Sequence, residues 1–190
     1  MKQILITITI LLLASGCAKS PTVDNNATSK EPSNTTPSEI ETSSQQEFNF
    51  EEFSKVYKFD GSIPNSWAIE YIPTLESINI YDTKLTGTNL EKSQIFIRYF
   101  NANKFLTLNT VNILSQESLT LQSRDAIRYE IQKKSGIPNF PGQPTWRNER
   151  HSVTDIRHSV SNPSYFYVFA KNPNLPESDF NNFISSLVFH

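Results

Sequence analysis

The sequence AIRYEIQK occupies residues 126–133 and alternates between apolar and polar side chains from residue 127 to residue 132. Ile127, Tyr129 and Ile131 fall on one face of an extended chain, because successive side chains of a strand point to opposite faces. One apolar face and one polar face are typical of an antiparallel sheet that is covered on one side. We therefore predict a half-buried β-strand here.

The same kind of pattern recurs along most of the chain after residue 49. We predict further strands at residues 55–59 (leading to a turn at Asp60-Gly61), 67–72, 78–82, 94–100, 112–121, 151–158 and 165–170. Apolar alternation over short runs bounded by Pro, Gly and Asn favours strands over helices. The chain from residue 49 onward is therefore predicted to be rich in antiparallel β-structure.

The C-terminal segment has helical spacing instead. Phe180, Phe183, Ile184 and Leu187 fall at positions i, i+3, i+4 and i+7, which line one face of a helix. Shorter helices are predicted at residues 48–53 and near 103–108. Because helices and strands do not alternate regularly, the fold class predicted is α+β: an antiparallel sheet of about six to seven strands, flanked by a C-terminal helix and one or two short helices.

The N-terminal residues 1–17 have the pattern of a signal peptide. Lys2 precedes an apolar run over residues 4–13, which is too short to span a bilayer. The small residues Ala14, Ser15 and Gly16 then lead to Cys17, the only cysteine of the chain. This ending resembles the lipobox of bacterial lipoproteins, which implies cleavage before Cys17 and its acylation, with palmitate among the chains. The alternative is an ordinary signal peptide that is cut away together with Cys17.

Residues 18–48 are predicted to be a disordered linker. Of these 31 residues, 19 are Ser, Thr, Asn, Gln or Pro. Such a segment cannot bury enough apolar surface to offset the entropy lost on ordering. We therefore place the folded domain at residues 49–190, a length that can hold one hydrophobic core.

One family shares the expected order of elements in the domain. An early Pro64-Asn65-Ser66-Trp67 precedes the second strand, a run of strands follows, and a closing helix leads to Leu187-Val188-Phe189. This order resembles the PsbP-like domains, over residues 50–190. The resemblance implies an antiparallel sheet with flanking helices and a role in binding or assembly outside the cytoplasm, and it carries no catalytic residues over.

The segment SGIPNFPGQPTWRNERHSVTDIRH, residues 135–158, concentrates the candidate site residues. Three prolines stiffen its first half around Phe140 and before Trp146, and a stiff loop with exposed aromatic side chains could hold a ligand or partner. The alternative is that Phe140 and Trp146 fold back and cap the core. Three arginines, Arg147, Arg150 and Arg157, could together bind an anion.

If residues 149–157 are extended, Glu149, His151, Val153, Asp155 and Arg157 share one face. His151 with Asp155 could act as a general base and the group that orients it. The other interpretation is a solvated strand face with weak cross-strand ion pairs. The spacing of these residues dictates no metal site.

We therefore expect a lipid-anchored binding or assembly module of the cell envelope. Its contact residues would be Phe140, Trp146, Arg147, Arg150 and Arg157. It would be held outside the cytoplasm through lipid on Cys17, at the cytoplasmic membrane or an outer membrane, with an envelope protein or a small anionic ligand as partner. The alternatives are an envelope hydrolase or transferase using His151 and Asp155, and a structural lipoprotein without a ligand.

Composition and motifs exclude several other classes. The net charge of −2 does not give the basic footprint of a nucleic-acid-binding protein. With five glycines in all, and no phosphate-binding or dinucleotide-binding glycine motif, the sequence indicates no cofactor.

Overall fold

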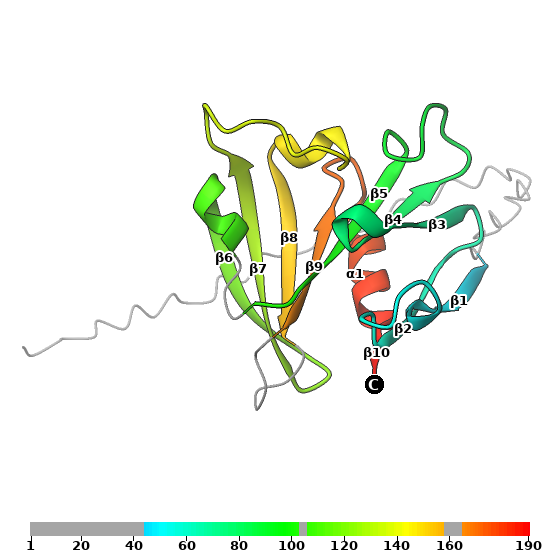
Figure 1. Cartoon of the computed structure of the whole chain (residues 1–190). Coiled ribbons are helices and arrows are strands. Elements are labelled where there is room, and N and C mark those ends of the chain that lie inside the picture. The colour runs from blue at the N-terminus through cyan, green and yellow to red at the C-terminus, as the bar shows by residue number, and fades with distance from the viewer. Residues whose placement is uncertain (1–43, 103–105, 158–164) are drawn as a thin grey trace, which may run out of the picture. The chain divides into compact units, whose positions relative to one another are not determined.

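The computed structural model describes residues 44–102, 106–157 and 165–190. Most of its strands form one antiparallel sheet of seven, which is strongly curved (Figure 1). In spatial order the strands are β3 (Trp67–Ile72), β4 (Ser77–Asp82), β5 (Ser93–Phe100), β9 (Phe166–Lys171), β8 (His151–Arg157), β7 (Arg124–Lys133) and β6 (Val111–Leu121). The predicted strands at 67–72, 78–82, 94–100, 112–121 and 126–133 are thus confirmed within two residues at each end.

A second, smaller sheet was not anticipated. It places β2 (Phe59–Pro64) between β1 (Gln45–Asn49) and β10 (Val188–Phe189), all antiparallel. The helix α1 (Glu177–Ser186) leads directly into β10 (Figure 1). Short 3-10 helices complete the fold: η1 (Phe50–Glu52), η2 (Pro73–Leu75), η3 (Leu106–Thr110) and η4 (Thr145–Asn148). The α+β class with a C-terminal helix is therefore confirmed.

Hydrophobic clusters cover both faces of the seven-stranded sheet. On one face, Phe180, Phe183 and Ile184 of α1 are buried, as their spacing predicts, and belong to the same cluster as Ile156 and Phe169 of the sheet. On the other face, Trp146 of η4 belongs to a cluster with residues of β5, β7, β8 and β9. The sheet is therefore covered on both sides, whereas the alternating pattern had suggested one.

The predicted start of the domain at residue 49 is several residues too late. β1 begins at Gln45, inside the segment expected to be disordered, and its residues pair with β2 from Gln45–Pro64 to Asn49–Asp60. The polar composition hid this strand, because four of its five residues are polar and it pairs with β2 along its whole length. Residues 1–43, with the expected signal peptide, Cys17 and most of the linker, lie outside the described residues.

The prediction for residues 55–61 is also wrong. The strand starts at Phe59 rather than at Lys55, and the expected turn at Asp60 and Gly61 lies inside β2. A Cβ atom at Gly61 would approach Leu187 Cδ2 to 3.0 Å and Phe50 Cε2 to 3.3 Å. This glycine therefore permits close packing of β2 under the helix end instead of making a turn.

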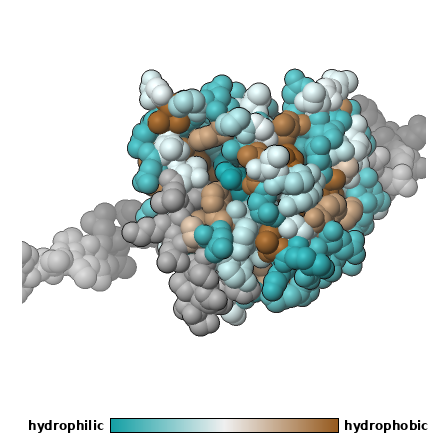
Figure 2. Space-filling model, in the orientation of Figure 1, coloured by the Kyte–Doolittle hydropathy of each residue, from teal (hydrophilic) through white to brown (hydrophobic). Residues whose placement is uncertain are grey.

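The short helices are 3-10 turns rather than α-helices. The helix expected at 48–53 is reduced to η1, and the one expected near 103–108 corresponds to η3, with residues 103–105 outside the described part. Among the described residues, no helix has both the length and the apolar character needed to cross a membrane. The visible face is largely hydrophilic, with apolar side chains in smaller patches (Figure 2).

Candidate functional site

Trp146 is a buried side chain that caps the sheet, and it is not available to a partner. It is 7% exposed, and its indole N–H donates a hydrogen bond to the Ser93 carbonyl at 3.2 Å. Its ring lies edge-on to that of His151, with centroids 5.6 Å apart. Of the two interpretations of this loop, the structure therefore supports the one in which Trp146 folds back onto the core.

Phe140 lies in the same loop and is partly buried. Its backbone N–H donates to Asn148 Oδ1 at 3.1 Å, which ties the proline-rich part of the loop to η4. The loop is therefore closed onto itself at this point, and Phe140 offers a partner only part of its surface.

Arg147 is buried as well, which removes it from the expected contact surface. It is 2% exposed, and its Nη1 lies 2.7 Å from His151 Nε2, while its Nε donates to Gln143 Oε1 at 3.3 Å. No carboxylate among the described residues contacts it. Burial, together with the charge of Arg98, lowers the pKa of Arg147 to about 9, so the guanidinium is still charged at neutral pH.

His151 is held as a neutral imidazole. Because a guanidinium can only donate, Nε2 accepts from Arg147, and Nδ1 donates to the Glu149 carbonyl at 2.8 Å. Burial, and then the charge of Arg147, lower the pKa of His151 to about 3. Both ring nitrogens are therefore engaged with groups other than Asp155.

Asp155 is also buried, and it pairs with a different residue. Arg157 Nη2 donates to Asp155 Oδ2 at 2.6 Å, whereas Asp155 Oδ1 is buried and has no hydrogen-bond partner among the described residues. Burial raises the pKa of Asp155 to about 6, against the lowering effect of Arg157. The structure thus does not form the predicted pair of His151 and Asp155. The expectation of a solvated strand face is wrong too, because α1 and the η4 loop cover the two sides of β8.

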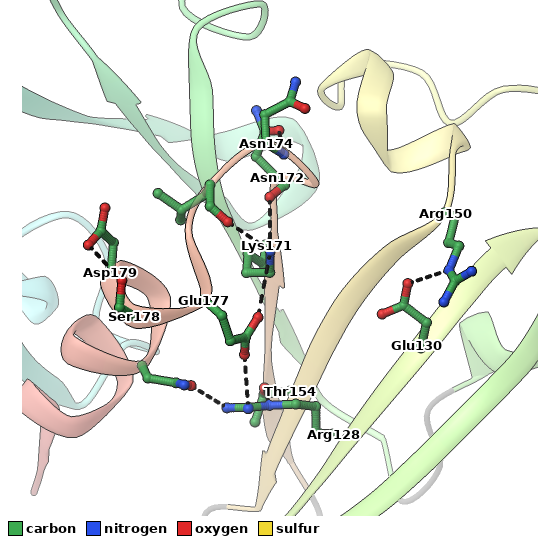
Figure 3. A network of polar contacts seen from close by, with 12 residues as sticks. Arg128, Glu130, Arg150, Thr154, Lys171, Asn172, Asn174, Glu177, Ser178 and Asp179 are labelled. Carbon is green, nitrogen blue, oxygen red and sulfur yellow. Dashed lines mark hydrogen bonds and ion pairs between the residues drawn. The ribbon is translucent and has the colours of Figure 1, made fainter. Parts of the chain in front are cut away.

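A polar hollow lies on the α1 side of the sheet, and sequence reasoning missed its central residue, Arg128. Its guanidinium donates to Glu177 Oε1 at 3.1 Å, Asn181 Oδ1 at 2.9 Å and Thr154 Oγ1 at 3.4 Å (Figure 3). The signal was present in AIRYEIQK, since Arg128 and Glu130 form the polar face of the strand whose apolar face was used to predict the fold.

Lys171 of β9 reaches the same carboxylate. Its Nζ lies 3.6 Å from Glu177 Oε2 and donates to the Leu175 carbonyl at 2.9 Å (Figure 3). The Lys171 side chain is 10% exposed and that of Arg128 is 22% exposed, whereas Glu177 is 51% exposed. The largely buried cations of Arg128 and Lys171 therefore share the half-exposed carboxylate of Glu177, the first residue of α1.

We call this hollow the Arg128 groove. It has a volume of about 480 Å³, and its lining consists of Arg128, Glu130, Arg150, His151, Ser152, Lys171, Pro173 and Glu177. A second hollow of about 290 Å³ shares Arg128, Glu130 and Ser152 with it and extends to Ser115, Gln116 and Glu117 of β6. Together they run across the sheet from β6 to the start of α1.

The predicted binding arginines separate in the structure. Arg150 lines the Arg128 groove and contacts Glu130 Oε1 at 2.7 Å (Figure 3). Arg157 lies on the opposite face of the sheet, with its guanidinium 4.2 Å from the ring centroid of Phe166, and Arg147 is buried. They do not form one anion site. Arg150 lies on the α1 side of the sheet, whereas Arg147 and Arg157 lie on the other face, where Arg147 contacts His151 and Arg157 pairs with Asp155. No group of three or more His, Cys, Asp or Glu in the described ranges could hold a metal ion.

Comparisons with known proteins give likenesses of structure alone. No family model matches the sequence, and no curated protein matches it. The structure is similar to the solution structure of cyanobacterial PsbP from Synechocystis sp. PCC 6803, with a TM-score of 0.49 and 10% sequence identity, covering 80% of this chain and 96% of that one. It is also similar to a crystal structure from Bacteroides thetaiotaomicron, with a TM-score of 0.31 and 9% identity, covering 76% of this chain and 48% of that one.

Proposed function

We propose that this protein is a lipid-anchored binding module of the cell envelope, in which the Arg128 groove receives an anionic group of the ligand. The supporting observation is the convergence of Arg128 and Lys171 on the single carboxylate of Glu177. Arginine and lysine recognise carboxylates and phosphates through charge-assisted hydrogen bonds. A ligand anion that takes the place of Glu177 would meet both cations already positioned by Thr154, Asn181 and the Leu175 carbonyl.

Binding is favoured over the alternative of a hydrolase or transferase. That alternative needs His151 to act as a base oriented by Asp155, and a base must reach the proton it removes. In this structure Nε2 of His151 faces Arg147 and the residue is 2% exposed, so neither that nitrogen nor the ring is open to a substrate.

We further propose that the domain is PsbP-like. The support is the order of its elements after Trp67: a meander of strands, a helix packed on the sheet, and a final short strand at Val188–Phe189. The proposed anchor fits this arrangement, because 27 residues lie between Cys17 and β1, enough chain to separate the domain from a membrane surface.

The anchor is tested in cells with the full-length chain and Cys17→Ser. We expect labelled palmitate to enter the wild-type protein and not Cys17→Ser, and the wild type to partition with membranes that detergent dissolves. Stable anchoring requires two or more acyl chains, so loss of Cys17 is expected to remove it entirely. Equal labelling of both proteins, or a wild type found only in the cytosol, would contradict the anchor while leaving the groove proposal intact.

The proposal for the Arg128 groove is tested by removing the carboxylate of Glu177, which competes with a ligand anion for Arg128 and Lys171. We expect Glu177→Gln to bind inorganic phosphate or succinate several-fold more tightly than the wild type, because Gln keeps the shape of Glu177 and leaves Arg128 and Lys171 uncompensated. A tenfold gain would correspond to about 1.4 kcal/mol. Isothermal titration of the full-length protein in detergent measures both probes, and their ratio distinguishes a phosphate site from a carboxylate site.

Glu52→Gln is the matched control, since it makes the same charge change at an exposed position of η1, outside the residues that line the groove. If Glu177→Gln and Glu52→Gln bind the probes equally, the groove is not an anion site. A structural lipoprotein without a ligand would behave in that way.

A further inference from the structure

The strand β6 is an open edge of the seven-stranded sheet. It is 11 residues long and pairs with β7 alone among the described residues. Residues 112–118 are exposed without interruption, whereas the strand at the other edge, β3, is half-buried or buried along its length. An edge strand directs every second backbone N–H and C=O outward, where another strand can pair with them.

β6 also lacks most of the devices that keep edge strands apart. Edges are usually protected by lysine, proline, inward-pointing charges or bulges. β6 has Glu117 as its single charged residue, no proline and no lysine, and one bulge at Leu114. Ile113 and Leu114 beside that bulge are 45% and 47% exposed, which makes them two of the four large apolar side chains exposed in the described part of the chain. This edge therefore has the composition of a surface that is covered by another strand.

We infer that β6 pairs antiparallel with β6 of a second copy of this chain, about a two-fold axis at Ser118. Residues 115–121 keep one continuous register with β7, so this stretch is regular strand and follows the bulge. An axis at Ser118 pairs Ser118 with itself, Gln116 with Thr120, and Glu117 with Leu119, while Ser115 meets Leu121. The two copies would form one sheet of fourteen strands from two sheets of seven.

Other axes along the strand fit less well. An axis at Glu117 would place two carboxylates directly opposite each other, which destabilises an antiparallel pair. An axis at Gln116 would bring Ser118 against the bulged Leu114 and break the register. With the axis at Ser118, no like charges face each other, and Ile113 and Leu114 lie beside the β6–β7 turn of the second copy. A two-fold axis needs such a self-complementary segment, and this is the reason to name a second copy as the occupant.

A cysteine at the axis tests the pairing in the full-length protein in its membrane. Opposed Cα atoms of an antiparallel pair lie about 4.5–5.5 Å apart, within the range that a disulfide spans. We expect Ser118→Cys to give a disulfide-linked dimer as its main species after mild oxidation, seen on a non-reducing gel. Thr120→Cys is the matched control: its own copy would lie about 14 Å away along the strand, because four residues separate it from its partner position.

Charged substitutions of Ser118 test the same pairing independently of the disulfide. Ser118→Lys and Ser118→Glu should each be monomeric by sedimentation, because each places its new charge opposite itself, and mixing the two should restore a dimer. Equal crosslinking of Ser118→Cys and Thr120→Cys, or a wild type that stays monomeric at high concentration, would overturn the inference. The second outcome would leave the β6 edge to a strand of a different protein, and neither outcome affects the proposal for the Arg128 groove.

Discussion

Trp146→Ala is expected to lower the free energy of unfolding by about 3–5 kcal/mol, the usual cost of removing a large buried aromatic side chain. The indole fills the cluster on the η4 side of the sheet and is 7% exposed. Its removal would also leave the Ser93 carbonyl without the indole N–H and expose the neighbouring His151 ring. Urea denaturation followed by circular dichroism measures the change.

Two variants separate packing from hydrogen bonding at this position. Trp146→Phe keeps most of the apolar volume and should cost less than Trp146→Ala, with the lost hydrogen bond contributing about 1 kcal/mol. Phe140→Ala, in the same loop but only partly buried, should cost less than Trp146→Ala. If Trp146→Ala were as stable as the wild type, Trp146 would return to the set of candidate contact residues.

When the pH falls from 7 to 4, the free energy of unfolding of Asp155→Asn is expected to drop by about 3 kcal/mol more than that of the wild type. The pKa of His151 is lowered to about 3, so between pH 6.5 and pH 3 the unfolded chain binds more protons than the folded one, and stability falls as the pH falls. The pKa of Asp155 is raised to about 6, so between pH 6 and pH 4 the folded chain binds more protons, and its contribution to stability rises as the pH falls.

In the wild type, the effects of His151 and Asp155 on stability therefore oppose each other as the pH falls. Replacing either residue reveals the effect of the other. Each unit of pKa shift is worth about 1.4 kcal/mol, and the Asp155 window spans about two units. Asp155→Asn leaves the destabilising effect of acid on His151 unopposed, whereas His151→Gln should be stabilised relative to the wild type on acidification. Urea titrations at pH 7, 5.5 and 4 measure this, with the exposed Asp125→Asn as the control for the loss of a carboxylate. Parallel pH curves for the wild type and Asp155→Asn would show that Asp155 is not perturbed by burial.

The candidate site was harder to predict than the fold because its residues come from distant segments. Arg128 on β7, Lys171 on β9 and Glu177 at the start of α1 meet only when β8 and β9 have inserted between β7 and β5. Nothing in the local sequence marks Lys171 as the partner of Glu177. The segment 135–158 is dense in aromatic and charged residues, which is typical of a contact surface, but in the structure Trp146 and Arg147 are buried against the sheet.

The same distinction explains which features the sequence determined by itself. Period-two alternation in residues 126–133 and the helical spacing of Phe180, Phe183 and Ile184 specify strand and helix, because each pattern depends only on the geometry of its own backbone. The tertiary structure alone decided that Gln45–Asn49 is a strand, that Gly61 packs under Leu187, and that His151 and Asp155 are buried with separate partners. These features depend on which element covers which face of the sheet, and the local spacing of residues in one segment does not specify which distant segment it packs against or pairs with.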